Sequence, residues 1–86
     1  MDTTWYLYIL RCADGSLYTG ITTDVERRLE EHRGGKGAKY TRGRGPLELV
    51  YTEECGTHSL ALKRELAIKA MKTTRKNDLI KSYKSR

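Results

Sequence analysis

The spacing of apolar and polar residues changes several times along this chain, and each change predicts an element. Residues 5–12, WYLYILRC, are rich in aromatic and aliphatic side chains, and residues 17–21, LYTGI, form a second such run. The segment ADGS, residues 13–16, separates the two runs. Because Asp-Gly between two apolar runs is a strong turn signal, this region is predicted to be a β-hairpin.

The next segment, TTDVERRLEEHR at residues 22–33, has helical spacing. Val25 and Leu29 lie one turn apart and predict the buried stripe of a helix. Thr23 is followed three residues later by Glu26, which is the pattern of a capping box and predicts the start of the helix. The glycine pair that follows predicts its end.

Residues 34–46, GGKGAKYTRGRGP, form a basic, glycine-rich loop. Residues 47–54, LELVYTEE, then alternate apolar and polar side chains, which predicts a third strand. In that strand we expect Leu47, Leu49 and Tyr51 to point inward.

Two further helices are predicted after the third strand. One covers residues 57–71, THSLALKRELAIKAM, with Thr57 or Ser59 as its cap. The other covers residues 74–86, and its apolar stripe consists of Leu79, Ile80 and Tyr83. The order β-β-α-β-α-α with hairpin-linked strands predicts an α+β fold in which helices flank a three-stranded antiparallel sheet. We expect one domain over residues 1–86.

The length of the hairpin loop decides whether its tyrosines meet. A two-residue turn would place Tyr8 and Tyr18 on opposite faces of the hairpin. A three-residue loop with Gly15 in the left-handed conformation pairs Tyr8 with Gly20 and Leu10 with Tyr18, so that both phenols share a face. We predict the three-residue loop, and we expect Gly20 to leave space there for a substrate backbone.

Two charged residues of the first helix are predicted to face the sheet. At 100° per residue, Arg28 and His32 lie beside the stripe that begins at Val25, whereas Arg27 points outward and is expected to pair with Glu31. Each has an ordinary alternative. His32 could be a histidine at the edge of the core bonded to a backbone carbonyl, and Arg28 could form an ion pair with a nearby acid.

Glu65 occupies an unusual position in the second predicted helix. Apolar residues surround it on both sides of the helix, so its carboxylate is expected to be partly desolvated and to need a cation. The cation could be Lys69 one turn later, an arginine from elsewhere, or a metal ion.

The charge distribution favours a polyanionic partner. The net charge is +6, residues 33–45 contain no acid, and basic residues far outnumber acids from residue 63 to the end. Cys12 and Cys55 lack the spacing of a metal or disulfide motif, and no leader or run of ~20 apolar residues is seen. We therefore expect a reduced, cytoplasmic protein that is not inserted in a membrane.

These residues together carry a family resemblance. The tripeptide YLY at residues 6–8, the tripeptide YTG at residues 18–20, Arg28, His32 and Glu65 follow one another in the order seen in GIY-YIG nucleases. The chain is similar in particular to the small standalone bacterial proteins of that family. It departs from the motif at Tyr6, which replaces a glycine, and at Thr19, which replaces an isoleucine.

The resemblance implies a Mg²⁺- or Mn²⁺-dependent, structure-specific DNA endonuclease of repair or recombination. Tyr8, Tyr18, Arg28 and His32 would be catalytic, and Glu65 would bind a single metal ion. Hydrolysis of a phosphodiester needs an activated water and stabilisation of phosphoryl charge, and these residue types can supply both. Which of Tyr8, Tyr18 or His32 is the base stays open.

The basic loop is expected to hold the nucleic acid. Its cations can neutralise phosphates, and an exposed tyrosine can stack on an unpaired base. The residues concerned are Lys36, Lys39, Tyr40, Arg42 and Arg44. The expected substrate is branched, nicked or single-stranded DNA, and RNA is also compatible. Two alternatives remain: a nucleic-acid-binding module of the same fold without turnover, and an interaction domain for a repair protein.

Overall fold

The computed structural model describes residues 3–84, and it confirms the predicted class and order of elements. The elements are β1 (Trp5–Arg11), β2 (Leu17–Thr22), α1 (Val25–Arg33), a short 3₁₀ turn η1 (Lys39–Thr41), β3 (Glu48–Gly56), α2 (His58–Lys69) and α3 (Thr73–Lys84). The three strands form one antiparallel sheet in the order β2-β1-β3. The predicted end of the last helix, at residues 85 and 86, lies outside the described range. Across residues 3–84, each helix is too short or too polar to cross a bilayer.

The hairpin has the predicted three-residue loop. Cys12 N donates to Ser16 O at 2.8 Å, and Gly15 has φ +86°, in the left-handed region that favours glycine. Tyr8 therefore pairs with Gly20, and two pairs further along Leu10 pairs with Tyr18. The two tyrosines consequently project from the same face of the sheet.

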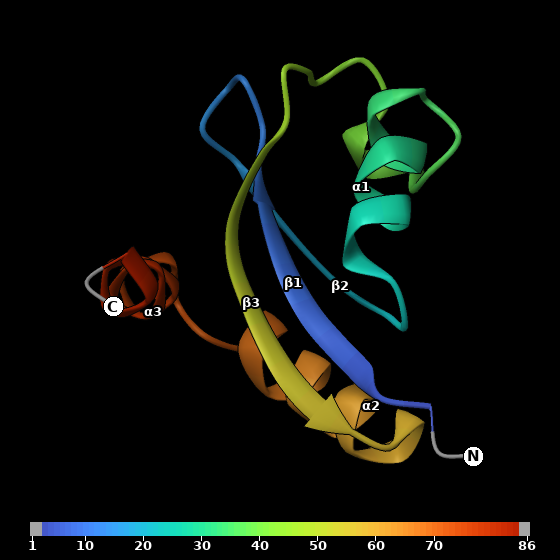
Figure 1. The fold of residues 1–86 in the computed structure, drawn as a ribbon. Helices are drawn as coiled ribbons and strands as arrows, with labels where there is room; N and C mark the ends of the chain where they lie inside the picture. The colour runs from blue at the N-terminus through green and yellow to red at the C-terminus, as the bar shows by residue number, and fades with distance from the viewer. Residues whose placement is uncertain (1–2, 85–86) are drawn as a thin grey trace.

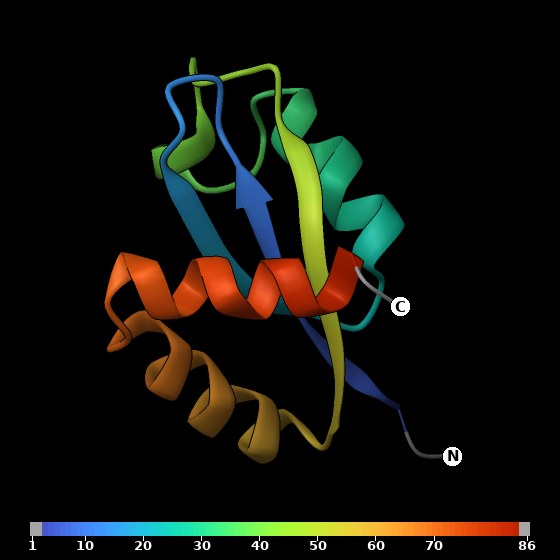
Figure 2. The same ribbon diagram turned by 90° about the vertical axis from the view of Figure 1, so that its left-hand side faces the viewer.

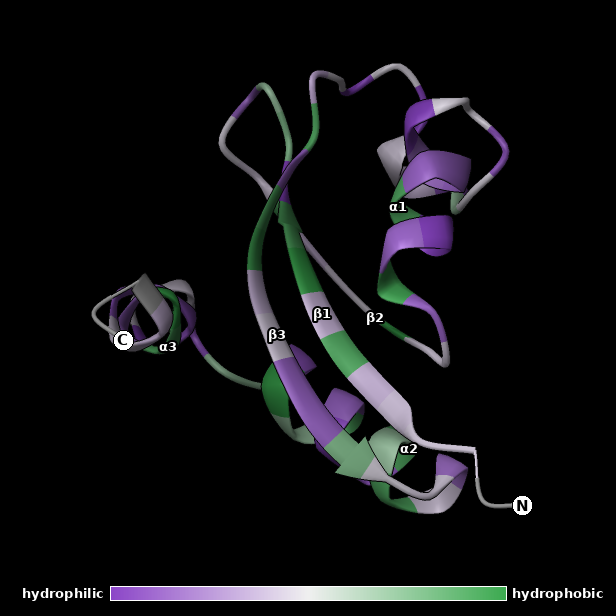
Figure 3. Ribbon diagram, in the orientation of Figure 1, coloured by the Kyte–Doolittle hydropathy of each residue, from purple (hydrophilic) through white to green (hydrophobic). Residues whose placement is uncertain are grey.

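Helices cover both faces of the sheet. Figure 1 shows α1 on one side of the strands and α2 and α3 on the other, and Figure 2 shows α3 running across the strands. The side chains of β1 supply both faces alternately, and the leucine and isoleucine positions of the strand are the hydrophobic bands along β1 in Figure 3. Between the sheet and α1 lies a buried cluster with partly buried residues packed on it: Tyr8, Leu10, Cys12 and Leu47, with Tyr18, Val25, Leu29 and Leu49.

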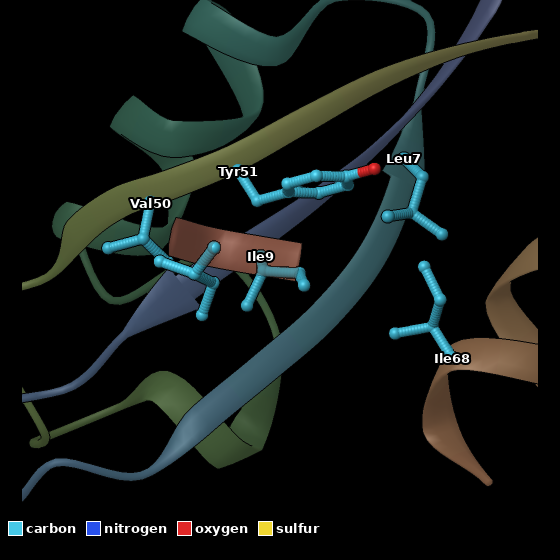
Figure 4. Packing of buried hydrophobic residues seen from close by; sticks show 6 residues of the cluster. Leu7, Ile9, Val50, Tyr51 and Ile68 are labelled. Atoms are coloured by element: carbon cyan, nitrogen blue, oxygen red, sulfur yellow. The ribbon is translucent and has the colours of Figure 1, made fainter. Parts of the chain in front are cut away.

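The second cluster lies between the sheet and the last two helices. Leu7 and Ile9 of β1 share a buried cluster with Ile68 of α2, and Figure 4 shows these side chains together. Ile80 of α3 belongs to the same cluster. Leu79 and Tyr83 pack against the same cluster, so the predicted stripe of the last helix is confirmed. Ile68 is fully buried, and its replacement by alanine would cost about 2–5 kcal/mol.

A bulge in β3 overturns one detail of the sequence interpretation. Ile9 pairs with Tyr51 and Leu10 with Leu49, which leaves Val50 as an extra residue. Leu47 and Leu49 accordingly pack toward α1, whereas Tyr51 packs in the opposite cluster. The expectation that all three share one inward face is wrong, because the bulge shifts the alternation by one residue.

The first helix also starts one residue later than its sequence pattern indicates. Asp24, not Thr23, is the N-cap, because its Oδ1 accepts a hydrogen bond from Arg27 N at 3.1 Å. The predicted end is confirmed, since Gly34 caps the helix and Gly35 has φ +77°. In α2 the predicted cap Thr57 accepts from Leu60 N.

Candidate active site

Three aromatic rings from three elements meet on the α1 face of the sheet. Tyr8 of β1, Tyr18 of β2 and His32 of α1 lie with ring centroids 5.2–6.3 Å apart. Tyr8 and His32 are each 2% exposed, and Tyr8 Oη lies 2.8 Å from His32 Nε2. The three-residue hairpin loop makes this cluster possible, because it places both tyrosines toward the helix that carries His32.

The glycine-rich loop closes over the other side of the His32 ring. His32 Nδ1 lies 2.9 Å from the hydroxyl of Thr41 in η1 and 3.3 Å from Ala38 N. Thr41 is itself buried, and its hydroxyl is also 2.9 Å from Ala38 O. His32 is therefore bonded to two hydroxyls and a backbone N–H, and its surroundings differ from the alternative of a histidine bonded to a backbone carbonyl.

Two positions of the proton on the neutral His32 ring fit these contacts. The Thr41 hydroxyl donates to Ala38 O, so it accepts from an N–H at Nδ1, and Nε2 then accepts the hydroxyl proton of Tyr8. If Nδ1 instead accepts from Ala38 N at 3.3 Å, the ring proton is on Nε2 and is donated to Tyr8 Oη. The shorter contacts favour the first arrangement, in which Tyr8 donates to His32.

Burial shifts the pKa of both groups in this pair. Desolvation is the main cause that raises the pKa of Tyr8 to about 12, and the nearby Arg28 guanidinium offsets part of the rise. Burial also lowers the pKa of His32 below 6.5, and the positive charge of Arg28 acts in the same direction. His32 is thus neutral at pH 7, and one of its ring nitrogens can accept a hydrogen bond.

Two glycines make room for these rings. A Cβ on Gly20 would lie 2.6 Å from Cζ of Tyr8, and a Cβ on Gly37 would overlap the ring of His32. The expectation that Gly20 leaves space for a substrate backbone is therefore wrong: the Tyr8 phenol occupies that space. Gly20 remains a structural residue of the site, because it lets Tyr8 lie flat across its neighbouring strand.

Arg28 lies beside Tyr8 at the surface of the cluster. It is close enough to lower the pKa of the Tyr8 hydroxyl, and its side chain is 33% exposed. Its Nη1 also forms an ion pair with Glu31 Oε1 at 2.9 Å. The predicted outward pair of Arg27 with Glu31 is wrong, since Glu31 is within one turn of both arginines and bonds Arg28. The pair occupies one of five guanidinium N–H donors, so others remain for an anion.

Glu65 is the partly desolvated carboxylate that the sequence predicts. Its side chain is 18% exposed, and its Oε2 lies 3.4 Å from Lys69 Nζ. The negative charge of Glu65 contributes to the raised pKa of Tyr8, which places it within electrostatic reach of the cluster. Within residues 3–84 no group of three or more His, Cys, Asp or Glu side chains converges. Glu65 could therefore hold a divalent ion only together with water and substrate oxygens, which is a common mode for Mg²⁺.

The basic loop is anchored to the hairpin loop through Arg44, near its carboxyl end. Ala13 N donates to Arg44 O at 2.8 Å, and Arg44 pairs with Asp14 at 2.6 Å. Arg44 also lies over the ring of Tyr40, 4.5 Å from its centroid, and Tyr40 stacks against Tyr18. The remaining predicted cations of the loop have exposed side chains: Lys36, Lys39 and Arg42. The ring of Tyr40 is 41% exposed beside these contacts.

Sequence reasoning missed the part of the loop that holds His32. The sequence pattern assigns Gly37, Ala38 and Thr41 to the basic loop and indicates no role for them in holding His32. A loop has no apolar periodicity that would single out a buried threonine within it. The one available signal was the glycine at position 37, which a crowded backbone position would require.

Comparisons with known proteins identify the family of the chain. The model of the GIY-YIG catalytic domain matches residues 4–79. The UPF0213 protein DP2720 of Desulfotalea psychrophila is 56% identical over 79 residues, which cover 91% of this chain and 72% of that protein.

Solved structures give the same result. The solution structure of the UPF0213 protein BH0048 from Bacillus halodurans has 49% identity and a TM-score of 0.59, and covers 91% of this chain and 83% of that one. The solution structure of EF2693 from E. faecalis has 41% identity and a TM-score of 0.66, with 100% and 94% of the two chains covered. With the Tyr8, Tyr18, Arg28, His32 and Glu65 positions on one fold, the chain belongs to the GIY-YIG catalytic-domain family, alongside the UPF0213 proteins.

Proposed function

We propose that this protein is a Mg²⁺- or Mn²⁺-dependent endonuclease that cleaves phosphodiester bonds in structured DNA. The observation that carries the proposal is the hydrogen-bonded pair of Tyr8 and His32, with Arg28 beside it. A buried, pKa-shifted cluster of this kind next to a half-exposed arginine is more typical of a reactive site than of a core. Membership of a nuclease family supports the same conclusion.

In this proposal Tyr8 takes a proton from the attacking water while it passes its own hydroxyl proton to His32 Nε2, 2.8 Å away. The Arg28 guanidinium beside Tyr8 Oη would stabilise negative charge that develops on the phenol during this transfer. Because the pKa of Tyr8 is raised, the two proton transfers are coupled, and no separate phenolate has to form first. Tyr18, in contact with Tyr8 and His32, lies where it can donate to a phosphoryl oxygen or to the leaving group. His32 is then the final acceptor of the proton, and Tyr8 relays it.

Arg28 is proposed to bind the scissile phosphate. A guanidinium offers a planar pair of donors that fits a phosphate, which lysine cannot reproduce. Its ion pair with Glu31 would hold the side chain near this orientation before substrate binds. Glu65 would hold the metal ion, which when bound supplies Lewis-acid stabilisation of the phosphoryl charge.

Lys36, Lys39 and Arg42 are proposed to contact phosphates around the site. The sequence contains no pattern typical of base-edge readout, so discrimination would come from the shape of the DNA. Branched, nicked or single-stranded DNA in repair or recombination is the proposed substrate class, and a cytoplasmic location follows from that role.

One observation favours a second candidate, a binding module without turnover. Both charged groups that would meet the reacting phosphate and metal are already paired, Arg28 with Glu31 and Glu65 with Lys69. If those pairs persist in the complex, the protein would bind nucleic acid and not cleave it. Weak, salt-sensitive binding without cleavage in Mg²⁺ or Mn²⁺ would identify this candidate. Binding to another protein that does not change when competitor DNA is added would instead indicate an interaction domain for a repair protein.

A cleavage panel tests the proposal. Branched, nicked and single-stranded DNAs are incubated with the wild-type protein over a range of Mg²⁺ and Mn²⁺ concentrations. Glu65→Gln removes the carboxylate charge at nearly constant volume, and Glu54→Gln makes the same change at an exposed position of β3. We expect cleavage that requires the metal, is lost in Glu65→Gln and is kept in Glu54→Gln. Full activity of Glu65→Gln would refute the assignment of the metal site.

A further inference from the structure

A groove runs across the exposed edge of β2, from the active site to α3. One pocket of about 250 Å³ is lined by Tyr18, Tyr40, Lys69 and Lys76 together with residues of β2. A second pocket of about 230 Å³ continues past the hairpin loop and the first residue of α3. The two pockets share three lining residues, Leu17, Tyr40 and Lys76, so they form one continuous depression. Figure 2 shows η1 above and the start of α3 below the same edge strand.

Lys76 is the most unusual residue of this groove. It lines both pockets and is only partly exposed, although lysine usually keeps its charge fully solvated. Within residues 3–84 no carboxylate forms an ion pair with it. A cation held in a depression without a counterion creates a local site for an anion, because the surrounding low-dielectric walls strengthen its field.

The groove is connected to the proposed metal residue. Lys69 lines the first pocket, and its Nζ lies 3.4 Å from Oε2 of Glu65. Tyr18 connects the groove to the aromatic cluster, because its ring contacts His32 in the cluster and Tyr40 in the groove. A chain of phosphates that passes Arg28 and Glu65 could therefore continue past Lys69 to Lys76.

The groove has the chemistry of a nucleic acid strand. Lys69 and Lys76 can bind phosphates, and the partly exposed Tyr40, which lines the same groove, can stack on a base or sugar. We propose that this groove binds a single-stranded arm of the substrate, with Lys69 and Lys76 on consecutive phosphates. The inference rests on the proposed function and adds to it the path of the strand.

Binding measurements without catalysis test the groove separately. The full chain is titrated, in EDTA, into fluorescein-labelled oligothymidylate and into a blunt duplex, and anisotropy is recorded over a range of salt concentrations. Lys76→Gln removes the proposed contact, and Lys63→Gln removes the same charge from an exposed position of α2 outside both pockets. A single-strand phosphate contact contributes ~0.7 to the salt slope. We therefore expect Lys76→Gln to weaken oligothymidylate binding about fivefold at 0.1 M salt and to lower that slope by about 0.7.

The same titrations contain the results that would overturn the inference. Equal losses for Lys76→Gln and Lys63→Gln would mean that only bulk charge matters. An equal loss on the blunt duplex would mean that the groove does not select a single strand. Cleavage by the wild-type protein in Mg²⁺ is measured in parallel. If the wild-type protein cleaves DNA but Lys76→Gln has no selective effect, the groove proposal is wrong and the proposed function stands. If Lys76→Gln has the selective effect but the wild-type protein does not cleave, the proposed function is wrong and the groove proposal stands.

Discussion

Replacement of Gly20 by alanine should disrupt the Tyr8–His32 pair from the neighbouring strand. The added Cβ would lie 2.5 Å from Tyr8 Oη and 2.6 Å from Tyr8 Cζ, well inside van der Waals contact. The phenol cannot simply swing aside, because it is 2% exposed and hydrogen-bonded to His32 at 2.8 Å. Either the ring shifts and the hydrogen bond breaks, or the two strands separate.

The cost can be worked out from these contacts. Overpacking of one carbon in a close-packed region costs about 1–3 kcal/mol. Loss of a buried hydrogen bond adds about 1 kcal/mol. Gly20→Ala should therefore lower the free energy of unfolding by about 2–4 kcal/mol, which corresponds to a fall in Tm of about 10–20 °C for a domain of this size.

Urea unfolding followed by circular dichroism measures this loss. Gly34→Ala is the matched control, since its added Cβ would meet its nearest neighbour, Glu30 O, at an ordinary 3.4 Å. We expect Gly34→Ala to change stability by less than about 1 kcal/mol. A Gly20→Ala protein as stable as wild type, with unchanged NMR signals of His32, would refute the view that Gly20 exists to accommodate Tyr8.

Two further predictions concern the surroundings of His32. Thr41→Val removes the hydroxyl 2.9 Å from His32 Nδ1 at nearly constant volume. Loss of this buried hydrogen bond should lower the free energy of unfolding by ~1–2 kcal/mol and therefore lower Tm by about 5–10 °C. An unchanged Tm would mean that this bond does not hold the loop. Burial lowers the pKa of His32 in the folded protein below the value of 6.5 expected in the unfolded chain. As pH falls below 6.5, the unfolded chain therefore binds a proton at His32 before the folded protein does, which destabilises the fold. The free energy of unfolding should therefore rise with pH through that window, and His32→Gln should remove the rise, whereas an identical pH dependence in both proteins would contradict the shift.

The hairpin and the two tyrosines could be predicted because local chemistry decides them. Asp14-Gly15 demands a tight loop, and the left-handed Gly15 then fixes which residues oppose each other. The faces of Arg28 and His32 follow from helical geometry once Val25 and Leu29 define the stripe. In each case a few residues close together in the sequence determine the backbone geometry and therefore which way the side chains face.

The errors arise where spacing leaves two outcomes nearly equal in energy. Glu31 is one turn from both Arg27 and Arg28, and the bond it makes depends on the Tyr8 hydroxyl on another element. Thr23 and Asp24 are both good caps, and the carboxylate takes the N–H. The bulge at Val50 depends on packing from two helices, which no alternation within β3 reveals.

Arg28, and not its neighbour Arg27, is proposed to act on the scissile phosphate. Single-turnover cleavage of the preferred DNA in Mg²⁺ is measured for wild type, Arg28→Ala and Arg27→Ala, two variants that lose the same charge at adjacent positions. Removal of one preorganised donor to a transition-state charge costs about 10²–10³ in rate. We expect a loss of that size for Arg28→Ala and a change of less than about threefold for the exposed Arg27→Ala. Equal rates for the two variants would contradict the account.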